Sequence, residues 1–187
     1  RVDDRSGLAA GGTKPALFVP LDQQALLSVA IYPLVLPRPF SLIVNVEFAL
    51  LPLFGWLSVA NRGVVLVRQW PAQAKAGMRR AAERLAQGDS FGVSIEGRRS
   101  VDGRLSPYKK GPAVIAIEAQ CDVVPFMTHG EWELWPKGQW AIRPGVIDAV
   151  VYPPISTRGM QPDDRHALVA QLRALAVSER RLRGRPG

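Results

Sequence analysis

The sequence is poor in the side chains that support most metal and nucleophile chemistry. Its 187 residues include one cysteine, Cys121, and two histidines, His129 and His166. A single cysteine excludes a disulfide within the chain, and the sequence holds no Cys/His cluster of the kind that binds a structural zinc ion. Any chemistry that needs a histidine base therefore has only two residues that could provide one.

Long uncharged apolar runs are also lacking. The most apolar stretch, residues 24–67, is interrupted by four prolines and by Arg38, Asn45 and Glu47. A membrane-spanning helix needs about 20 largely uninterrupted apolar residues. We therefore expect this stretch to form core elements of the fold, a surface that dips into one leaflet of a membrane, or both.

Acidic side chains are outnumbered by basic ones. The 24 Lys and Arg residues against 16 Asp and Glu residues give a formal charge of +8. Such a basic protein favours anionic partners, which include nucleic acid, anionic lipid head groups and phosphorylated substrates. No nucleic-acid-binding motif accompanies the charge, so we do not expect nucleic acid to be the partner.

Alternating short strands and helices predict an α/β fold with a mostly parallel central sheet flanked by helices. The length and a hydrophobic content of 47% suit a single domain with its own core. The apolar patterns predict strands at 16–19, 40–46, 63–68, 91–95 and 123–127, with one or two more within 140–151. They predict helices at about 25–33, 73–87, 111–119 and 166–177, and a short helical or irregular piece at 47–56.

The two ends differ in composition from this central part. Residues 1–15 are polar and glycine-rich, without the apolar segment of a signal peptide, and we expect a loose leader there. Residues 16–178 form the expected domain. Residues 179–187 carry four arginines, and we expect a basic tail that is solvated or contacts anionic lipid.

The densest group of functional candidates follows the strand expected at 91–95. In a parallel sheet this is the carboxyl edge, where α/β folds bind ligands. Arginine donates two parallel hydrogen bonds to a phosphate, and the N-terminus of the helix expected at 111–119 also attracts anions. We therefore expect this loop to bind a phosphate. The candidate residues are Glu96, Gly97, Arg98, Arg99, Ser100 and Lys109.

This loop resembles the third sequence block of the glycerolipid acyltransferases, the family typified by lysophosphatidate (1-acylglycerol-3-phosphate) acyltransferase. The family's block reads roughly Phe-Pro-Glu-Gly-Thr-Arg-Ser, followed by a Gly, a Leu and a Phe-Lys-x-Gly run. Ser94, Ile95 and Arg98 depart from it. The matching residues are Glu96, Gly97, Arg99, Ser100, Gly103, Leu105, Lys109 and Gly111.

Four further stretches resemble other parts of the same family, in the family's order. Residues 63–69 are similar to its Gly-x-Ile-Phe-Ile-Asp-Arg strand, and residues 45–55 to a preceding stretch with Glu, Pro and Gly. Residues 123–126 are similar to an apolar-Val-Pro-apolar block, and residues 153–155 to a late Pro-Pro-Ile. Five matches in order, over about residues 16–177, identify the chain as a member of this family.

The resemblance implies an enzyme of phospholipid biosynthesis with a glycerol-3-phosphate acyltransferase-like fold. It would move an acyl chain from acyl-CoA or acyl-carrier protein to the hydroxyl of a lysophospholipid. Arg68, Arg98 and Arg99 would hold the acceptor phosphate, and Glu96 and Gly97 would shape the site. Neither a metal nor an organic cofactor is implied beyond the acyl carrier. The apolar stretch would meet the membrane, which implies a peripheral membrane protein at the cytoplasmic face.

The family's catalytic first block is changed in this chain. There a His takes the proton from the acceptor hydroxyl, and an Asp five residues later orients that His. At the matching positions Asp22 replaces the His and Leu27 replaces the Asp. Asp22 is a candidate base if burial raises its pKa. His129, just beyond the strand expected at 123–127, is a candidate substitute.

Two hypotheses of different classes follow. The chain is an acyltransferase with an unconventional base, or it is a pseudoenzyme that acts as a lipid-binding or partner-binding subunit at a membrane. The changed block at Asp22 and Leu27 favours the pseudoenzyme. The arginine loop that follows Glu96 and Gly97 favours a site that still binds a phosphate-bearing lysolipid.

Overall fold

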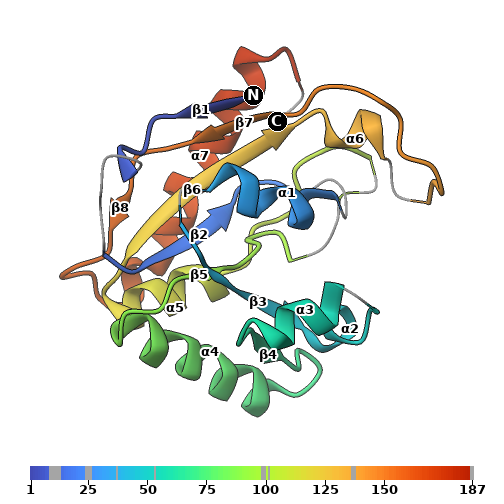
Figure 1. Ribbon diagram of the computed structural model, residues 1–187. Coiled ribbons are helices and arrows are strands. Elements are labelled where there is room, and N and C mark those ends of the chain that lie inside the picture. The colour runs from blue at the N-terminus through green and yellow to red at the C-terminus, as the bar shows by residue number, and fades with distance from the viewer. Residues whose placement is uncertain are drawn as a thin grey trace.

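A mixed sheet runs through the middle of the computed structural model (Figure 1), which describes residues 1–8, 14–23, 27–36, 38–52, 54–97, 100, 102–135 and 138–185. In these ranges the strand order is β1-β7-β6-β2-β5-β3-β4, and β8 pairs with β6 off this path. The strands are β1 (Val2–Asp4), β2 (Ala16–Pro20), β3 (Ser41–Asn45), β4 (Val64–Leu66), β5 (Phe91–Gly92), β6 (Asp122–His129), β7 (Asp148–Val151) and β8 (Ile155–Ser156).

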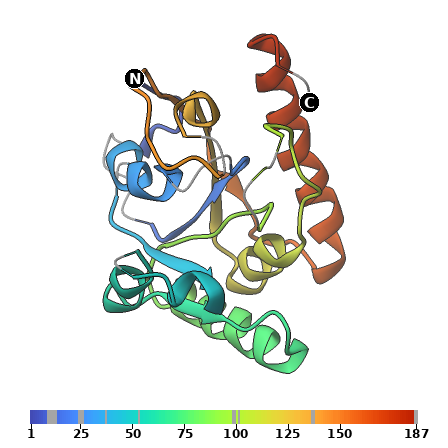
Figure 2. The same cartoon turned by 90° about the vertical axis from the view of Figure 1, so that its right-hand side faces the viewer.

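Helices cover both faces of this sheet (Figure 2). They are α1 (Leu27–Val35), α2 (Val46–Ala49), α3 (Phe54–Ala60), α4 (Pro71–Ala86), α5 (Gly111–Ala119), α6 (Glu131–Leu134) and α7 (Arg165–Leu182), with a 3-10 turn, η2 (Pro162–Asp164). The α/β architecture with a mostly parallel central sheet and flanking helices is therefore confirmed. Strands β6, β2, β5, β3 and β4 run parallel, whereas β7 and β8 run antiparallel to β6.

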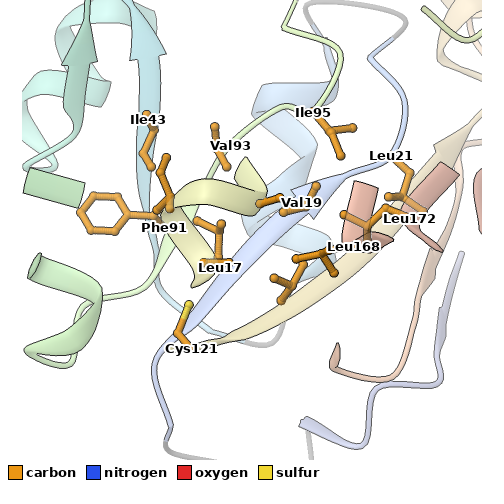
Figure 3. Packing of buried hydrophobic residues seen from close by; sticks show 14 of the residues in the cluster. Leu17, Val19, Leu21, Ile43, Phe91, Val93, Ile95, Cys121, Leu168 and Leu172 are labelled. Carbon is orange, nitrogen blue, oxygen red and sulfur yellow. The ribbon is translucent and has the colours of Figure 1, made fainter. Parts of the chain in front are cut away.

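Strand β2 is the centre of the core because both of its faces are covered. Every residue of β2 is buried, as expected for a continuous apolar strand in a parallel sheet. On one side Leu17 and Val19 meet Leu168 and Leu172 of α7 (Figure 3), in a cluster that also contains residues of α4 and α5. On the other side Phe18 joins a second cluster formed by α1, β6 and β7.

Several elements differ in length from the sequence-based expectation. Helix α1 continues past Pro33 to Val35, and β5 contains only Phe91 and Gly92 of the expected 91–95. The part of 140–151 that forms a strand is β7 alone. Strand β5 is short because its ladder stops at Gly92, which pairs with Phe18 and Leu42, although β2 and β3 both continue beyond these residues.

Both chain ends are more ordered than expected. Val2–Asp4 pair with β7, so the expectation of a loose leader is wrong for these residues. The edge of β7 offers backbone groups that need partners, and β1 supplies them. At the other end α7 continues to Leu182, and Arg180 is 2% exposed, so a solvated tail from residue 179 is also wrong. Arg180 is buried because its guanidinium finds a carbonyl acceptor at Gly103.

Candidate functional site

An apolar cavity of about 330 Å³ lies between α1, α2, β3 and the end of β5. Its walls come from the stretch that the sequence marks as most apolar, together with residues that follow β2 and β5. A cavity of this size and lining suits a flexible hydrocarbon chain rather than a polar metabolite. The apolar residues around it include Val29, Tyr32, Leu36, Phe40, Leu42, Val44, Phe48, Leu51, Leu66 and Phe126.

Arg68 and Gly97 provide the cationic part of the cavity wall. Arg68 Nη1 donates a hydrogen bond of 2.7 Å to the carbonyl oxygen of Gly97, and both residues line the cavity. Gly97 has a φ of +71°, a conformation that glycine adopts without strain. The structure thus brings together two of the residues expected to bind the acceptor, from two sequence blocks.

Glu96 is buried behind the cavity wall and bonds to the backbone. Its carboxylate accepts 2.7 Å and 2.5 Å hydrogen bonds from the N–H groups of Gln23 and Ser106. Burial raises the pKa of Glu96 to about 7, although these two bonds oppose the shift. The Ser100 N–H donates to the carbonyl oxygen of Gln23 at 2.8 Å. Glu96 and Ser100 therefore hold the segment that contains Asp22.

Asp22 lies two residues beyond the end of β2 and is 2% exposed. Burial raises the pKa of its carboxyl to about 8, and Glu131 and Glu96 act in the same direction, while Arg180 opposes them. A group with this pKa exchanges a proton near neutral pH, as a general base must. The neighbouring residue Gln23 lines the cavity, whereas Asp22 is buried next to it and is not among the lining residues.

Leu27 begins α1 and has no group that could orient a base. The next residue, Ser28, is buried, and its hydroxyl donates a 2.5 Å hydrogen bond to Glu131 Oε2. Glu131 is fully buried at the start of α6, and burial raises its pKa. Ser28, Glu131 and Arg180 could not be recognised as buried near Asp22 from the sequence, because a polar residue in a short helix or in a basic tail is typical of a surface.

His129 is positioned away from the cavity. It ends β6, with its Nε2 atom 3.8 Å from Glu179 Oε1 of α7. Burial lowers the pKa of His129 to about 4, and neighbouring arginines add to this effect. Its imidazole is therefore neutral near pH 7 and packs against the C-terminal helix.

The remaining cationic candidates fall into two groups. Lys109 is exposed, and its backbone N–H donates to the carbonyl oxygen of Ile95 at 2.8 Å, which keeps it close to the Glu96 loop. Arg98 and Arg99 lie outside the described residues. Within the described ranges no group of three or more His, Cys, Asp or Glu side chains is arranged to hold a metal ion.

The surface around α2 and α3 is strongly apolar. Leu50, Trp56 and Leu57 are each at least 60% exposed, and Leu51 is both exposed and part of the cavity wall. In the views of Figures 1 and 2 these helices lie on the side opposite α7. Of the helices in the described part of the chain, none is long and apolar enough to cross a bilayer.

Comparison with known proteins shows to which family this fold and this site belong. The acyltransferase family model matches residues 14–129, which include Asp22, Arg68, Gly97 and His129. The chain therefore belongs to the acyltransferase family, and the family resemblance predicted from the sequence is confirmed.

Similar proteins within this family include 1-acyl-sn-glycerol-3-phosphate acyltransferases. One from Pseudomonas aeruginosa is 29% identical over 126 residues, which cover 67% of this chain and 49% of the relative. A chloroplastic one from Arabidopsis thaliana is 33% identical over 144 residues, 75% of this chain and 39% of the relative. The chain thus spans about half or less of the length of these relatives.

A solved structure confirms the fold. The crystal structure of the 1-acyl-sn-glycerophosphate (LPA) acyltransferase PlsC from Thermotoga maritima superposes with a TM-score of 0.76 at 26% identity. The superposition covers 100% of this chain and 73% of the other. The expected glycerol-3-phosphate acyltransferase-like architecture is therefore the observed one.

Proposed function

We propose that this chain transfers an acyl group from a thioester donor to the hydroxyl of a phosphate-bearing lysolipid. The observation that carries the proposal is the apolar cavity whose wall contains Arg68 and Gly97 beside Gln23. A lysolipid has the same two parts, an apolar chain and a phosphate. The names of the similar proteins from Pseudomonas aeruginosa and Thermotoga maritima point to the same substrate class.

Each part of such a lipid matches one part of the site. The hydrocarbon chain gains free energy by leaving water for the apolar cavity. The Arg68 guanidinium offers a charged hydrogen-bonding edge to the phosphate. Arg98, Arg99 and Lys109 remain predicted phosphate ligands from the neighbouring loop.

Asp22 is the proposed base. In its ionised form it takes the proton from the lysolipid hydroxyl, and the hydroxyl oxygen attacks the thioester carbonyl carbon. The carbon–sulfur bond then breaks, and the leaving thiolate takes the proton back from Asp22. A carboxyl with a pKa near 8 suits both transfers better than an ordinary surface carboxylate. The acyl donor is acyl-CoA or acyl-carrier protein, and the mechanism needs no further cofactor.

We further propose that α2 and α3 contact an anionic membrane from which the lipid enters. The exposed Trp56 and Leu57 suit the interface between lipid and water, and the net charge of +8 favours anionic head groups. Leu51 joins this surface to the cavity. A peripheral location at the cytoplasmic face stays a prediction of the family resemblance.

A second candidate function is favoured by the first block itself. Leu27 cannot replace the family's orienting Asp, and Asp22 lies behind the cavity wall. A pseudoenzyme that binds a phosphate-bearing lysolipid, or a protein partner at the membrane, would keep the cavity and Arg68 without the base.

One assay separates the two functions. Thiol release from acyl-CoA is measured with and without lysophosphatidate for the natural chain, for Asp22→Asn, and for a triple variant Leu21→Asn, Asp22→His, Leu27→Asp. Transfer by the natural chain that Asp22→Asn abolishes supports Asp22 as the base. A silent natural chain beside an active triple variant supports the pseudoenzyme. Equal transfer by the natural chain and Asp22→Asn contradicts the proposed base.

A further inference from the structure

Two arginines of α7 reach from the C-terminal helix to the loop that follows the Glu96 block. Arg180 Nη2 donates a 2.5 Å hydrogen bond to the carbonyl oxygen of Gly103. About two turns earlier on the same face of the helix, Arg173 Nη1 donates to the carbonyl oxygen of Ser106 at 3.1 Å. The Arg173 guanidinium also lies 5.3 Å from the ring centroid of Tyr108, a cation–π contact. Helix α7 lies outside the range that the family model matches.

The loop held in this way, residues 102–108, in turn holds the segment Leu21–Gln23. The Tyr108 hydroxyl donates to the carbonyl oxygen of Leu21. The Ser106 N–H and the Gln23 N–H share the Glu96 carboxylate, one on each oxygen. Asp22 therefore lies between two residues whose backbone groups are bonded to this loop or to Glu96.

The charges around Asp22 give Arg180 a second effect. The ionisable groups that act on Asp22 come from different elements: Glu131 from α6, Glu96 from the end of the β5 segment, and Arg180 from α7. The Thr128 backbone of β6 also hydrogen-bonds to Asp22. Of these charged groups Arg180 is the cation, and it favours the ionised carboxylate that Glu131 and Glu96 disfavour.

We propose that Arg173 and Arg180 are positioning residues, which hold the 102–108 loop against Leu21–Gln23 and so fix the Asp22 carboxyl in place. The C-terminal helix is then part of the site and not only a cover for the sheet. The catalytic consequence rests on the proposed function of Asp22, whereas the positioning of the segment does not.

The positioning is tested by amide hydrogen exchange in the full-length chain, followed by NMR at Gln23 and Ser100. Arg180→Met should speed exchange at these two amides by ~10-fold or more, because local opening becomes easier. Arg173→Met should give a smaller increase, and Arg180→Lys should restore part of the protection. Arg181→Met is the matched control, because Arg181 is the exposed neighbour on the same helix.

The outcomes separate this proposal from the function proposed above. Unchanged exchange at Gln23 and Ser100 in both Met variants overturns it, whatever the activity. If Arg180→Met does not fold, the same comparison between Arg173→Met, Arg180→Lys and the natural chain decides. Faster exchange in a chain without transferase activity keeps the positioning and rejects Asp22 as a base.

A chain that is active provides a further readout. Loss of Arg180 removes the cation that lowers the pKa of Asp22, so the acid limb of the pH–rate profile should move to higher pH in Arg180→Met. Arg180→Lys should move it back, and Arg181→Met should leave it in place. A profile that does not move would show that Arg180 has a structural role alone.

Discussion

The guanidinium of Arg68 packs against Gly97. Its Nη1 atom donates a 2.7 Å hydrogen bond to the Gly97 carbonyl oxygen, and a Cβ atom at position 97 would approach both Nη atoms to 3.0 Å. A Cβ atom at position 97 would therefore require the Arg68 guanidinium to move by a few tenths of an ångström. The orientation of the cationic wall of the cavity depends on this glycine.

Gly97→Ala should displace Arg68 and weaken lysophosphatidate binding by about 10-fold, which isothermal titration calorimetry would measure. The matched control is Gly159→Ala, because Gly159 also has a positive φ, of +82°, but nothing lies within 4 Å of its Cβ position. Both variants should lose roughly 1 kcal/mol of stability from backbone strain. Equal binding by the two variants would show that Arg68 does not contact the phosphate.

Glu96→Gln should destabilise the chain by about 1–3 kcal/mol, measured by urea unfolding. The carboxylate accepts an N–H on each oxygen, from Gln23 and Ser106, and an amide can accept only one of them. Glu118→Gln, at an exposed position of α5, is the control and should stay within about 0.5 kcal/mol. If Glu96→Gln is as stable as this control, the carboxylate does not hold the N–H groups of Gln23 and Ser106 as the structure shows.

The pKa of Asp22 predicts a pH-dependent stability. The pKa is about 8 in the folded chain, against an ordinary value of 3.8, so the unfolded chain loses this proton first. The contribution of Asp22 to the free energy of unfolding is therefore complete below about pH 4 and falls as the pH rises towards 8. The slope is at most about 1.4 kcal/mol per pH unit.

Asp22→Asn removes this titration and isolates the effect. The difference in the free energy of unfolding between the natural chain and Asp22→Asn, measured from pH 4 to 8, should shift steadily in favour of the variant. A difference that does not change with pH would place the Asp22 carboxyl in contact with water.

Leu57→Ser should weaken binding to vesicles that contain phosphatidylglycerol, measured by co-sedimentation. Leu57 of α3 is 60% exposed, and its transfer into the lipid interface contributes about 1–2 kcal/mol, a loss of roughly 10-fold in affinity. Leu182→Ser is the control, because Leu182 is 78% exposed at the end of α7, on the opposite side of the sheet (Figure 2). Equal losses in the two variants would contradict a specific membrane face at α3.

The core of the fold could be predicted because its elements have strong local patterns. Helix α4 is one example: Ala81, Ala82 and Leu85 lie on its buried face, as their spacing predicts. Strand β1 could not be predicted, because Val2–Asp4 are exposed and become a strand only by pairing with the edge of β7. A local pattern carries no information about an edge that forms far along the chain.

The site was predictable in part for the same physical reason. The family resemblance assigned Arg68 and Gly97 to one site, and the strand expected at 91–95 placed the Gly97 loop at the carboxyl edge of the sheet, where α/β folds bind ligands. The sequence could not place Arg180 or Glu131, whose burial depends on partners from remote elements. For His129 the sequence indicated only its place at the end of a strand and not the direction of its side chain, which lies 3.8 Å from Glu179 of α7.

The order of the strands also has a consequence for how the chain folds. Strand β2 is made early, yet Leu17 pairs with Phe91 on one side and with Val123 on the other. During synthesis the central strand must therefore wait for both neighbours, with its apolar faces uncovered. Folding is slow because the entropy of closing these long loops is lost before the strand pairs contribute any stabilising contacts. We expect this chain to need a chaperone, or slow expression at low temperature, to be obtained in soluble form.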